Sequence, residues 1–208
     1  MAKKMVLITG YPGTGKTYLS DIICGKIPHF ISVSIDGIKE QMWDQYGYDS
    51  EEQKKHLNKL SLQRFFSELE KLMSNGIDII SDYPFSQKQA PLLQKMSQQY
   101  GYEVLTIRLL ADLDTLFERQ AKRDLDSGRH LGHVLSRYHL GDKIQDRSQA
   151  DMLLDYDEFV ERCTKRGYGE FQMGKLIQLD VTNFASIDYT ELLDQVWNWV
   201  EGTVERSL

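Results

Sequence analysis

Cysteine and proline are scarce in this 208-residue chain, and acidic residues outnumber basic ones. The two cysteines, Cys24 and Cys163, lie far apart with no C-x-x-C spacing, which favours reduced, buried thiols over a disulfide or a zinc site. With four prolines and no linker rich in Pro, Gly or Ser, the sequence predicts a single domain over residues 1–208. The formal net charge of -6 argues against broad, sequence-independent nucleic-acid binding, which needs a basic face.

Long hydrophobic runs are also missing. The apolar runs are strand-sized, and only residues 1–4 precede the first, so we expect neither a membrane helix nor a signal peptide, and a cytoplasmic location. The charge is uneven: residues 119–147 hold seven Lys or Arg against four Asp or Glu, a net +3. This basic segment suits a compact polyanion such as ATP, with a solvated helix face as the alternative.

Short apolar runs alternate with helix-like stretches along the chain. The expected strands are Met5–Thr9, Phe30–Ser34, Ile77–Ser81, Glu103–Leu110 and Lys175–Asp180. This alternation predicts an α/β fold with a parallel sheet covered by helices on both faces. Because right-handed crossovers bring all strand carboxyl ends to one rim, we expect the functional site on that rim.

Several helix boundaries follow from capping patterns. Ser50 and Gln53 form a capping-box pattern before a long helix that Asn75-Gly76 ends, with a break near Ser61 left open. Asp112 is expected to cap a further helix. The final helix is expected to bury a stripe of Leu192, Leu193, Val196, Trp197 and Val200, with Trp199 off that stripe.

Residues 10–17, GYPGTGKT, fit the phosphate-binding pattern G-x-x-x-x-G-K-[ST] between an expected strand and an expected helix, Lys16–Gly25. A glycine-rich turn that holds Lys-Thr by chance is the alternative. In the functional interpretation the motif starts at Gly10, and backbone N–H groups of Gly13, Thr14 and Gly15 meet the phosphates. Lys16 would reach the β- and γ-phosphates, and the Thr17 hydroxyl would hold Mg²⁺.

Two acids follow expected strands. Asp36 comes after the second strand, where it could cap the next helix or accept a proton from a substrate hydroxyl, and position alone does not separate these roles. Lys39, three residues on, could pair with Asp36 or hold an anionic acceptor. Asp82 ends the third strand, and its place beside the phosphate loop favours a Mg²⁺ ligand over a turn aspartate.

Arginines supply a further set of candidates. Arg119 and Arg123 share one helix face by their i,i+4 spacing, although two solvated arginines would show the same spacing. Arg129 follows Gly128 in an expected mobile lid of about residues 125–147. A guanidinium there would stabilise the charge of a phosphoryl transition state while the lid excludes water.

Histidines and aromatic residues are less informative. The spacing of His130, His133 and His139 fits no common zinc pattern, which favours histidines that face solvent or substrate. Residues 41–62 and 142–174 are expected to cover the acceptor pocket. Their aromatic members are Trp43, Tyr46, Tyr48, Tyr156, Phe159, Tyr168 and Phe171.

With these residues identified, the chain resembles the small P-loop kinases of the adenylate-kinase-like group, especially those grouped with polynucleotide kinase, zeta toxins and chloramphenicol phosphotransferase. The resemblance runs from Met5 to about Asp180. It rests on GYPGTGKT, on SID and IISD at the second and third strands, on RQAKRDLDSGRH, and on IQLDVTN at the last strand. Of these, only GYPGTGKT is highly specific.

The resemblance implies a P-loop NTPase three-layer sandwich with strand order 2-3-1-4-5 and an arginine-bearing lid over the ATP phosphates. It also implies that Asp36 is the base and that adenine lies between Arg119 and the loop at residues 182–183. The chain departs from the group in two places. Lys39 stands where members acting on polynucleotides or nucleosides often have arginine, and residues 82–86, DYPFS, replace the D-G-F-P-R of nucleoside monophosphate kinases.

Together these features predict an ATP- and Mg²⁺-dependent phosphotransferase that moves the γ-phosphate to a hydroxyl of a small-molecule acceptor. The site would combine Lys16, Asp36, Arg123 and Arg129 as catalytic groups with Thr17 and Asp82 as metal ligands. Transfer to the 5′-hydroxyl of a nucleic acid is one alternative, which the net charge disfavours. A nucleotide-binding switch or ATPase that transfers nothing is the other.

Overall fold

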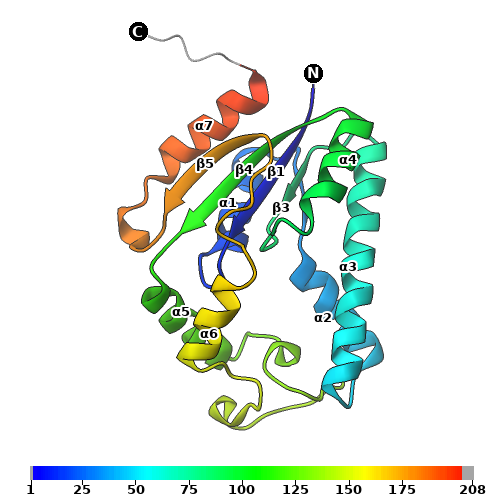
Figure 1. Cartoon of the computed structure of the whole chain (residues 1–208), viewed down its shortest axis with the longest axis vertical. Coiled ribbons are helices and arrows are strands. Elements are labelled where there is room, and N and C mark those ends of the chain that lie inside the picture. Colours follow the sequence, from blue (N-terminus) through cyan, green and yellow to red (C-terminus); the bar gives the residue numbers. More distant parts are fainter. Residues whose placement is uncertain (1, 203–208) are drawn as a thin grey trace.

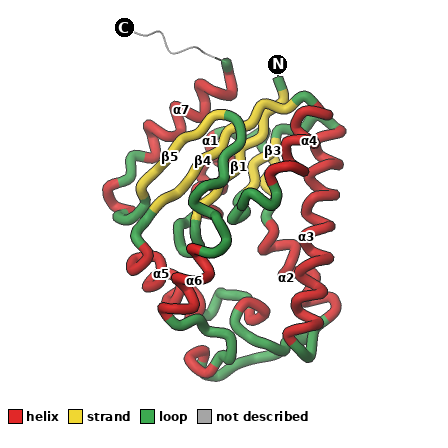
Figure 2. The backbone as a smooth tube through the Cα atoms, viewed as in Figure 1, coloured by secondary structure: helices red, strands yellow, loops and turns green. Residues whose placement is uncertain are grey.

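The computed structural model describes residues 2–202 and shows strands and helices in alternation (Figures 1 and 2). The strands are β1 (Lys3–Gly10), β2 (Ile31–Val33), β3 (Ile79–Ser81), β4 (Tyr102–Leu110) and β5 (Lys175–Asp180). The helices are α1 (Lys16–Lys26), α2 (Ile35–Tyr46), α3 (Glu51–Ser74), α4 (Ala90–Tyr100), α5 (Leu113–Leu125), α6 (Tyr156–Thr164) and α7 (Tyr189–Glu201). All five expected strands are therefore confirmed, although β2 and β3 are shorter than expected.

The five strands form one parallel sheet in the order β2-β3-β1-β4-β5. This order confirms the one that the resemblance implies. Strand β1 lies at the centre, and seven of its eight residues are buried, because helices cover both faces of the sheet. A near-continuous apolar run, rather than an alternating one, is typical of a central strand that is buried on both faces.

Side chains of β1 point alternately to two separate cores. Val6 and Ile8 pack against the apolar residues of α1 and α7 on one face. Met5 and Leu7 pack against α2, α3 and α4 on the other face. The result is a three-layer α/β/α sandwich, in which α7 and the α3–α4 pair lie on opposite sides of the sheet (Figure 1).

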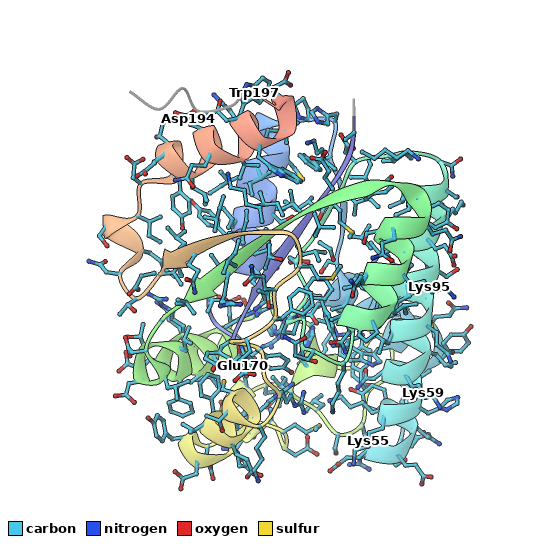
Figure 3. All side chains as sticks on the ribbon, turned by 45° about the horizontal axis from the view of Figure 1, so that its top comes forward. Lys55, Lys59, Lys95, Glu170, Asp194 and Trp197 are labelled. Atoms are coloured by element: carbon cyan, nitrogen blue, oxygen red, sulfur yellow. The ribbon has the colours of Figure 1, made fainter. Side chains whose placement is uncertain are left out.

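One open question about the helices is answered and one prediction needs correction. Helix α3 runs from Glu51 to Ser74 without a break at Ser61, whose hydroxyl donates to Leu57 O, one turn earlier, at 2.8 Å. In α7 the buried residues are Leu192, Val196 and Val200, each one turn apart. Trp199 falls beside this row and packs on the core, whereas Trp197 is 42% exposed and lies on the outer side of α7 (Figure 3). The caps at Ser50 and Asp112 are confirmed.

Beyond the carboxyl ends of the strands, α5 and α6 are joined by residues 126–155, which are mostly loop (Figure 2). This segment is hydrogen-bonded to the α2–α3 corner, the turn of residues 47–50 between these two helices. Tyr48 and Tyr138 exchange backbone hydrogen bonds of 2.8 Å, and the Tyr48 hydroxyl donates to Gly132 O and Leu135 O. The expected lid, about residues 125–147, thus connects the end of α5 with the turn between α2 and α3. Among residues 2–202, no helix is long and apolar enough to cross a membrane.

Candidate active site

The loop between β1 and α1 is shaped by glycines with positive φ. Gly13 has φ +85°, and a Cβ there would lie 2.8 Å from Leu116 O of α5, so the loop can pass this close to α5 only without a side chain. Gly15 has φ +81° and occupies the N-cap of α1, where no side chain caps the helix. The first N–H groups of α1 are therefore free for an anionic ligand at the cavity.

Lys16 lies under this loop and holds it in place. Its Nζ donates to Gly10 O at 3.1 Å and to Tyr11 O at 2.9 Å. Burial lowers the pKa of Lys16 to about 8, although the charges of Asp36 and Asp82 act in the opposite direction. Thr14, by contrast, turns away from the cavity, since its side chain is buried and donates to Tyr11 O.

Thr17 and Asp82 meet at the strand rim. The Thr17 hydroxyl donates to Asp82 Oδ2 at 2.5 Å, which joins the start of α1 to the end of β3. Asp82 is only 6% exposed, and its Oδ1 is buried without a hydrogen-bond partner among residues 2–202. Burial raises the pKa of Asp82, and its hydrogen bond from Thr17 opposes this. A hydroxyl and a carboxylate with an unsatisfied oxygen are the donors that Mg²⁺ prefers, so these two residues fit that ion.

Asp36 lies in the first turn of α2 and lines the same cavity. Its carboxylate contacts Lys39 Nζ at 3.4 Å and Arg123 Nη2 at 3.9 Å, and it accepts no hydrogen bond from the backbone of residues 2–202. Burial alone would raise the pKa of Asp36, but the nearby cations, chiefly Lys39 and His133, outweigh it and hold the pKa well below its usual range. The geometry therefore favours a carboxylate that faces ligand over a helix cap.

The three predicted arginines have different surroundings. Arg119 donates to Val181 O and Thr182 O, each at 2.7 Å, and its guanidinium lies 3.7 Å from the centre of the Phe184 ring. Arg123 is partly exposed beside Asp36. Arg129 is 11% exposed, and its Nε lies 3.6 Å from Asp124 Oδ1. Arg119 thus joins α5 to the loop after β5, while Arg123 and Arg129 face the cavity.

One cavity of about 510 Å³ brings nearly all predicted site residues together. Of these, Gly13, Gly15, Lys16, Thr17, Asp36, Asp82, Arg119, Arg123 and Arg129 line it, whereas Gly10 and Thr14 do not. Its lining holds seven basic residues, Lys16, Lys39, Arg119, Arg123, Arg129, Arg162 and Arg166, against three acidic ones, Asp36, Asp82 and Asp124. The excess of positive charge suits a polyanionic ligand.

The aromatic residues expected over the acceptor pocket are mostly elsewhere. Trp43, Tyr48, Phe159 and Phe171 are buried in the hydrophobic cores, and only Tyr168 of the seven lines the cavity. Sequence reasoning missed Arg162 and Arg166, which occupy this wall. Their signal was an i,i+4 pair of arginines near the end of a short helix, in a region where only the aromatic content had been considered.

The three histidines each pair with an acid of the α2 region. His130 lies 3.0 Å from Asp44, His133 2.7 Å from Glu40, and His139 2.9 Å from Asp49. These pairs join the segment of residues 126–155 to α2 and to the turn that follows it. Only His133 lines the cavity.

Comparison with known proteins agrees with this architecture. A family model described as AAA domain (AAA_33) matches residues 5–138. A candidate kinase from Chloroflexus aurantiacus J-10-fl has a similar structure, with a TM-score of 0.76, 18% identity, and coverage of 98% of this chain and 100% of that one. A gluconokinase from Sinorhizobium meliloti 1021 is similar at a TM-score of 0.54 and 12% identity, over 94% of this chain and 96% of that one.

No curated protein matches the chain in sequence. At these identities the two solved structures establish the fold alone, whereas the family model covers more than half of the chain. The model's range includes the phosphate loop, Asp36, Asp82 and the arginines of α5. The chain therefore belongs to this AAA domain family.

Proposed function

We propose that the protein is an ATP- and Mg²⁺-dependent phosphotransferase that moves the γ-phosphate of ATP to a hydroxyl of a small-molecule acceptor. The observation that carries the proposal is the convergence of Lys16, the Thr17–Asp82 pair and Asp36 on one cavity. The first three are groups that hold a nucleotide's phosphates and its metal ion. Asp36 is a carboxylate that accepts no backbone hydrogen bond from residues 2–202, and it faces the same space.

Nucleotide binding would rely on the loop of residues 10–15 and the start of α1. Free backbone N–H groups there meet the phosphates, and Lys16 would exchange its carbonyl partners, Gly10 O and Tyr11 O, for phosphate oxygens. Thr17 and Asp82 would hold Mg²⁺, which neutralises phosphate charge when bound. Phe184 and Arg119, beside Gly15, offer a flat surface against which adenine can stack.

In the transfer step, Asp36 would accept the proton of the acceptor hydroxyl. The acceptor oxygen forms a bond to the γ-phosphorus, the bond between that phosphorus and the bridging oxygen of ADP breaks, and ADP leaves. The cations that hold the pKa of Asp36 low in the free protein include Arg123 and Arg129. When these arginines turn to the transferring phosphoryl group, Asp36 becomes a stronger base.

The volume of the cavity and the net charge of the chain both support a small acceptor. A cavity of about 510 Å³ leaves little room beside ATP. The net charge of -6 weighs against a nucleic-acid chain, although a 5′-hydroxyl oligonucleotide belongs in the test. A switch that binds ATP without transfer is the remaining alternative, and dependence on an acceptor separates the two.

The test is Asp36→Asn, with labelled ATP and a panel of sugars, nucleosides, antibiotics and 5′-hydroxyl oligonucleotides. Wild-type protein should release ADP faster with the correct acceptor. Asp36→Asn should keep its ATP affinity while acceptor-dependent ADP release falls by roughly 10²- to 10⁴-fold. The matched control is Asp157→Asn, since Asp157 is an exposed acid in the first turn of α6, and it should behave like wild type. Transfer at the wild-type rate by Asp36→Asn would refute the assignment of the base.

A further inference from the structure

Two basic residues of the cavity take no part in the proposed transfer. Arg162 lies in the last turn of α6, and Arg166 lies in the turn that follows the helix. Both line the cavity, and neither forms an ion pair with any acid of residues 2–202. Arg166 Nη1 donates to the hydroxyl of Tyr168 at 3.1 Å, and Tyr168 is itself buried, which directs this guanidinium along the cavity wall.

The other charges of the cavity already have partners or assigned ligands. Asp36 contacts Lys39 and Arg123, and Asp124 contacts Arg129. Arg119 is held by two carbonyl groups, and Lys16 belongs with the phosphates. Arg162 and Arg166 therefore leave two positive charges at the cavity with no ion-pair partner in the part of the chain that the structure describes, an arrangement that an anionic ligand would neutralise.

The turn that holds Arg166 packs against the loop after β3, where Phe171 stacks on Phe85 and Gln87 Nε2 donates to Glu170 O at 3.3 Å. Burial raises the pKa of Tyr83 to about 12, and the charges of Arg166 and Asp36 both act on that hydroxyl. Arg162 acts on Lys54, as does Lys39, the neighbour of Asp36 on α2. Arg166 thus lies where the turn after α6 meets the loop after β3, and Tyr168, its hydrogen-bond partner, also packs against Tyr11 of the phosphate loop.

We propose that the acceptor carries an anionic group, a carboxylate or a phosphate, and that Arg162 and Arg166 bind it while its hydroxyl faces Asp36. This inference rests on the proposed phosphotransferase function. A guanidinium donates two parallel hydrogen bonds to either group, which fixes the orientation of a small molecule as well as its affinity. The acceptor class is therefore a small hydroxy acid or a phosphorylated polyol, and a neutral sugar or nucleoside would leave both arginines without an anionic partner.

The test measures anion binding with the phosphate loop already filled. Full-length protein is saturated with Mg²⁺ and a nonhydrolysable ATP analogue, and inorganic phosphate or acetate is then titrated in by calorimetry. We expect saturable binding at a second site. Arg162→Gln with Arg166→Gln should weaken it by about tenfold for each arginine, the usual effect of losing a charged hydrogen bond. Tighter binding of phosphate indicates a phosphorylated acceptor, and tighter binding of acetate indicates a carboxylate.

The matched control is Lys165→Gln, which removes one positive charge between the two arginines but from a residue that pairs with Glu161 outside the cavity. It should leave anion binding unchanged. Binding of the ATP analogue, measured first in every variant, separates the two proposals. If the analogue binds but the second-site anion is absent, or is unaffected by the double substitution, this inference is overturned and the phosphotransferase stands. If the analogue does not bind, both are overturned.

Discussion

Replacing Lys16 by methionine should make the free protein more stable while it abolishes nucleotide binding. Lys16 is enclosed by the phosphate loop, and burial lowers its pKa from 10.5 to about 8. Because a tenfold change in proton affinity corresponds to about 1.4 kcal/mol, the charged ammonium costs the folded state up to about 3 kcal/mol at pH 7. Methionine has a similar length and no charge, so Lys16→Met removes this cost.

Loss of the three hydrogen bonds of Lys16 Nζ reduces the gain in folding stability. They go to Gly10 O, Tyr11 O and Thr14 Oγ1, and Lys16→Met removes the donor from all three oxygens, which costs part of the gain. We therefore expect a net stabilisation of up to about 2 kcal/mol in urea unfolding, followed by tryptophan fluorescence. Mg²⁺ with ATP at a hundredfold excess over Kd should stabilise wild type by about 2.7 kcal/mol and leave Lys16→Met unchanged.

The pH dependence of folding stability provides an independent check of the charge cost at Lys16. Between pH 8 and pH 10.5 the folded wild type has lost the Lys16 proton while the unfolded chain still holds it, so the stability of the wild type rises with pH in this window. The advantage of Lys16→Met should therefore shrink above pH 8 and be lost near pH 10.5. If Lys16→Met is less stable than wild type at pH 7, or if their difference does not change with pH, the burial argument is wrong.

Three further substitutions test the phosphate loop, one proposed metal ligand and Arg129. Gly13→Ala should lower the free energy of unfolding in urea by at least about 1 kcal/mol, because the φ of Gly13 is positive and a Cβ would meet Leu116 O. The control Gly25→Ala, in open space on α1, should not destabilise the fold. Asp82→Asn should remove the extra rise in melting temperature that Mg²⁺ gives to ATP, and an unchanged rise would exclude Asp82 as a ligand. Arg129→Ala should lower turnover far more than ATP affinity in steady-state kinetics, and equal losses would make Arg129 an anchor.

The parts of the fold that could be predicted are those with short-range signals. The phosphate loop and Lys16 belong to one continuous motif, and β1 is a continuous apolar run, so neither depends on distant contacts. Asp36 and Asp82 could be placed on one rim because parallel strands align their carboxyl ends. The strand order itself came from the family resemblance, since local periodicity does not specify which strands are neighbours.

Residues that reach the site through long connections could not be predicted. Arg162 and Arg166 approach the cavity only because residues 126–155 cross to the α2–α3 corner and return to α6, a path set by contacts such as Tyr48 with Tyr138. The expectation that aromatic residues cover the acceptor pocket failed for a different reason. Trp43 and Phe171 are large apolar groups whose burial in a core gains more than exposure at a polar cavity, and composition alone does not separate these two environments.

The charge distribution shows why an acidic protein can still select anions. The cavity lining carries a net charge of +4, counting its seven basic and three acidic residues, so the remainder of the chain carries -10. A long polyanion would meet that acidic exterior along most of its length, whereas a small anion is exposed mainly to the cavity field at close range. Under the proposed function, the arrangement that would attract ATP disfavours a nucleic-acid chain. Arg162 and Arg166, which form no ion pair among residues 2–202, would extend this selection from the nucleotide to the acceptor.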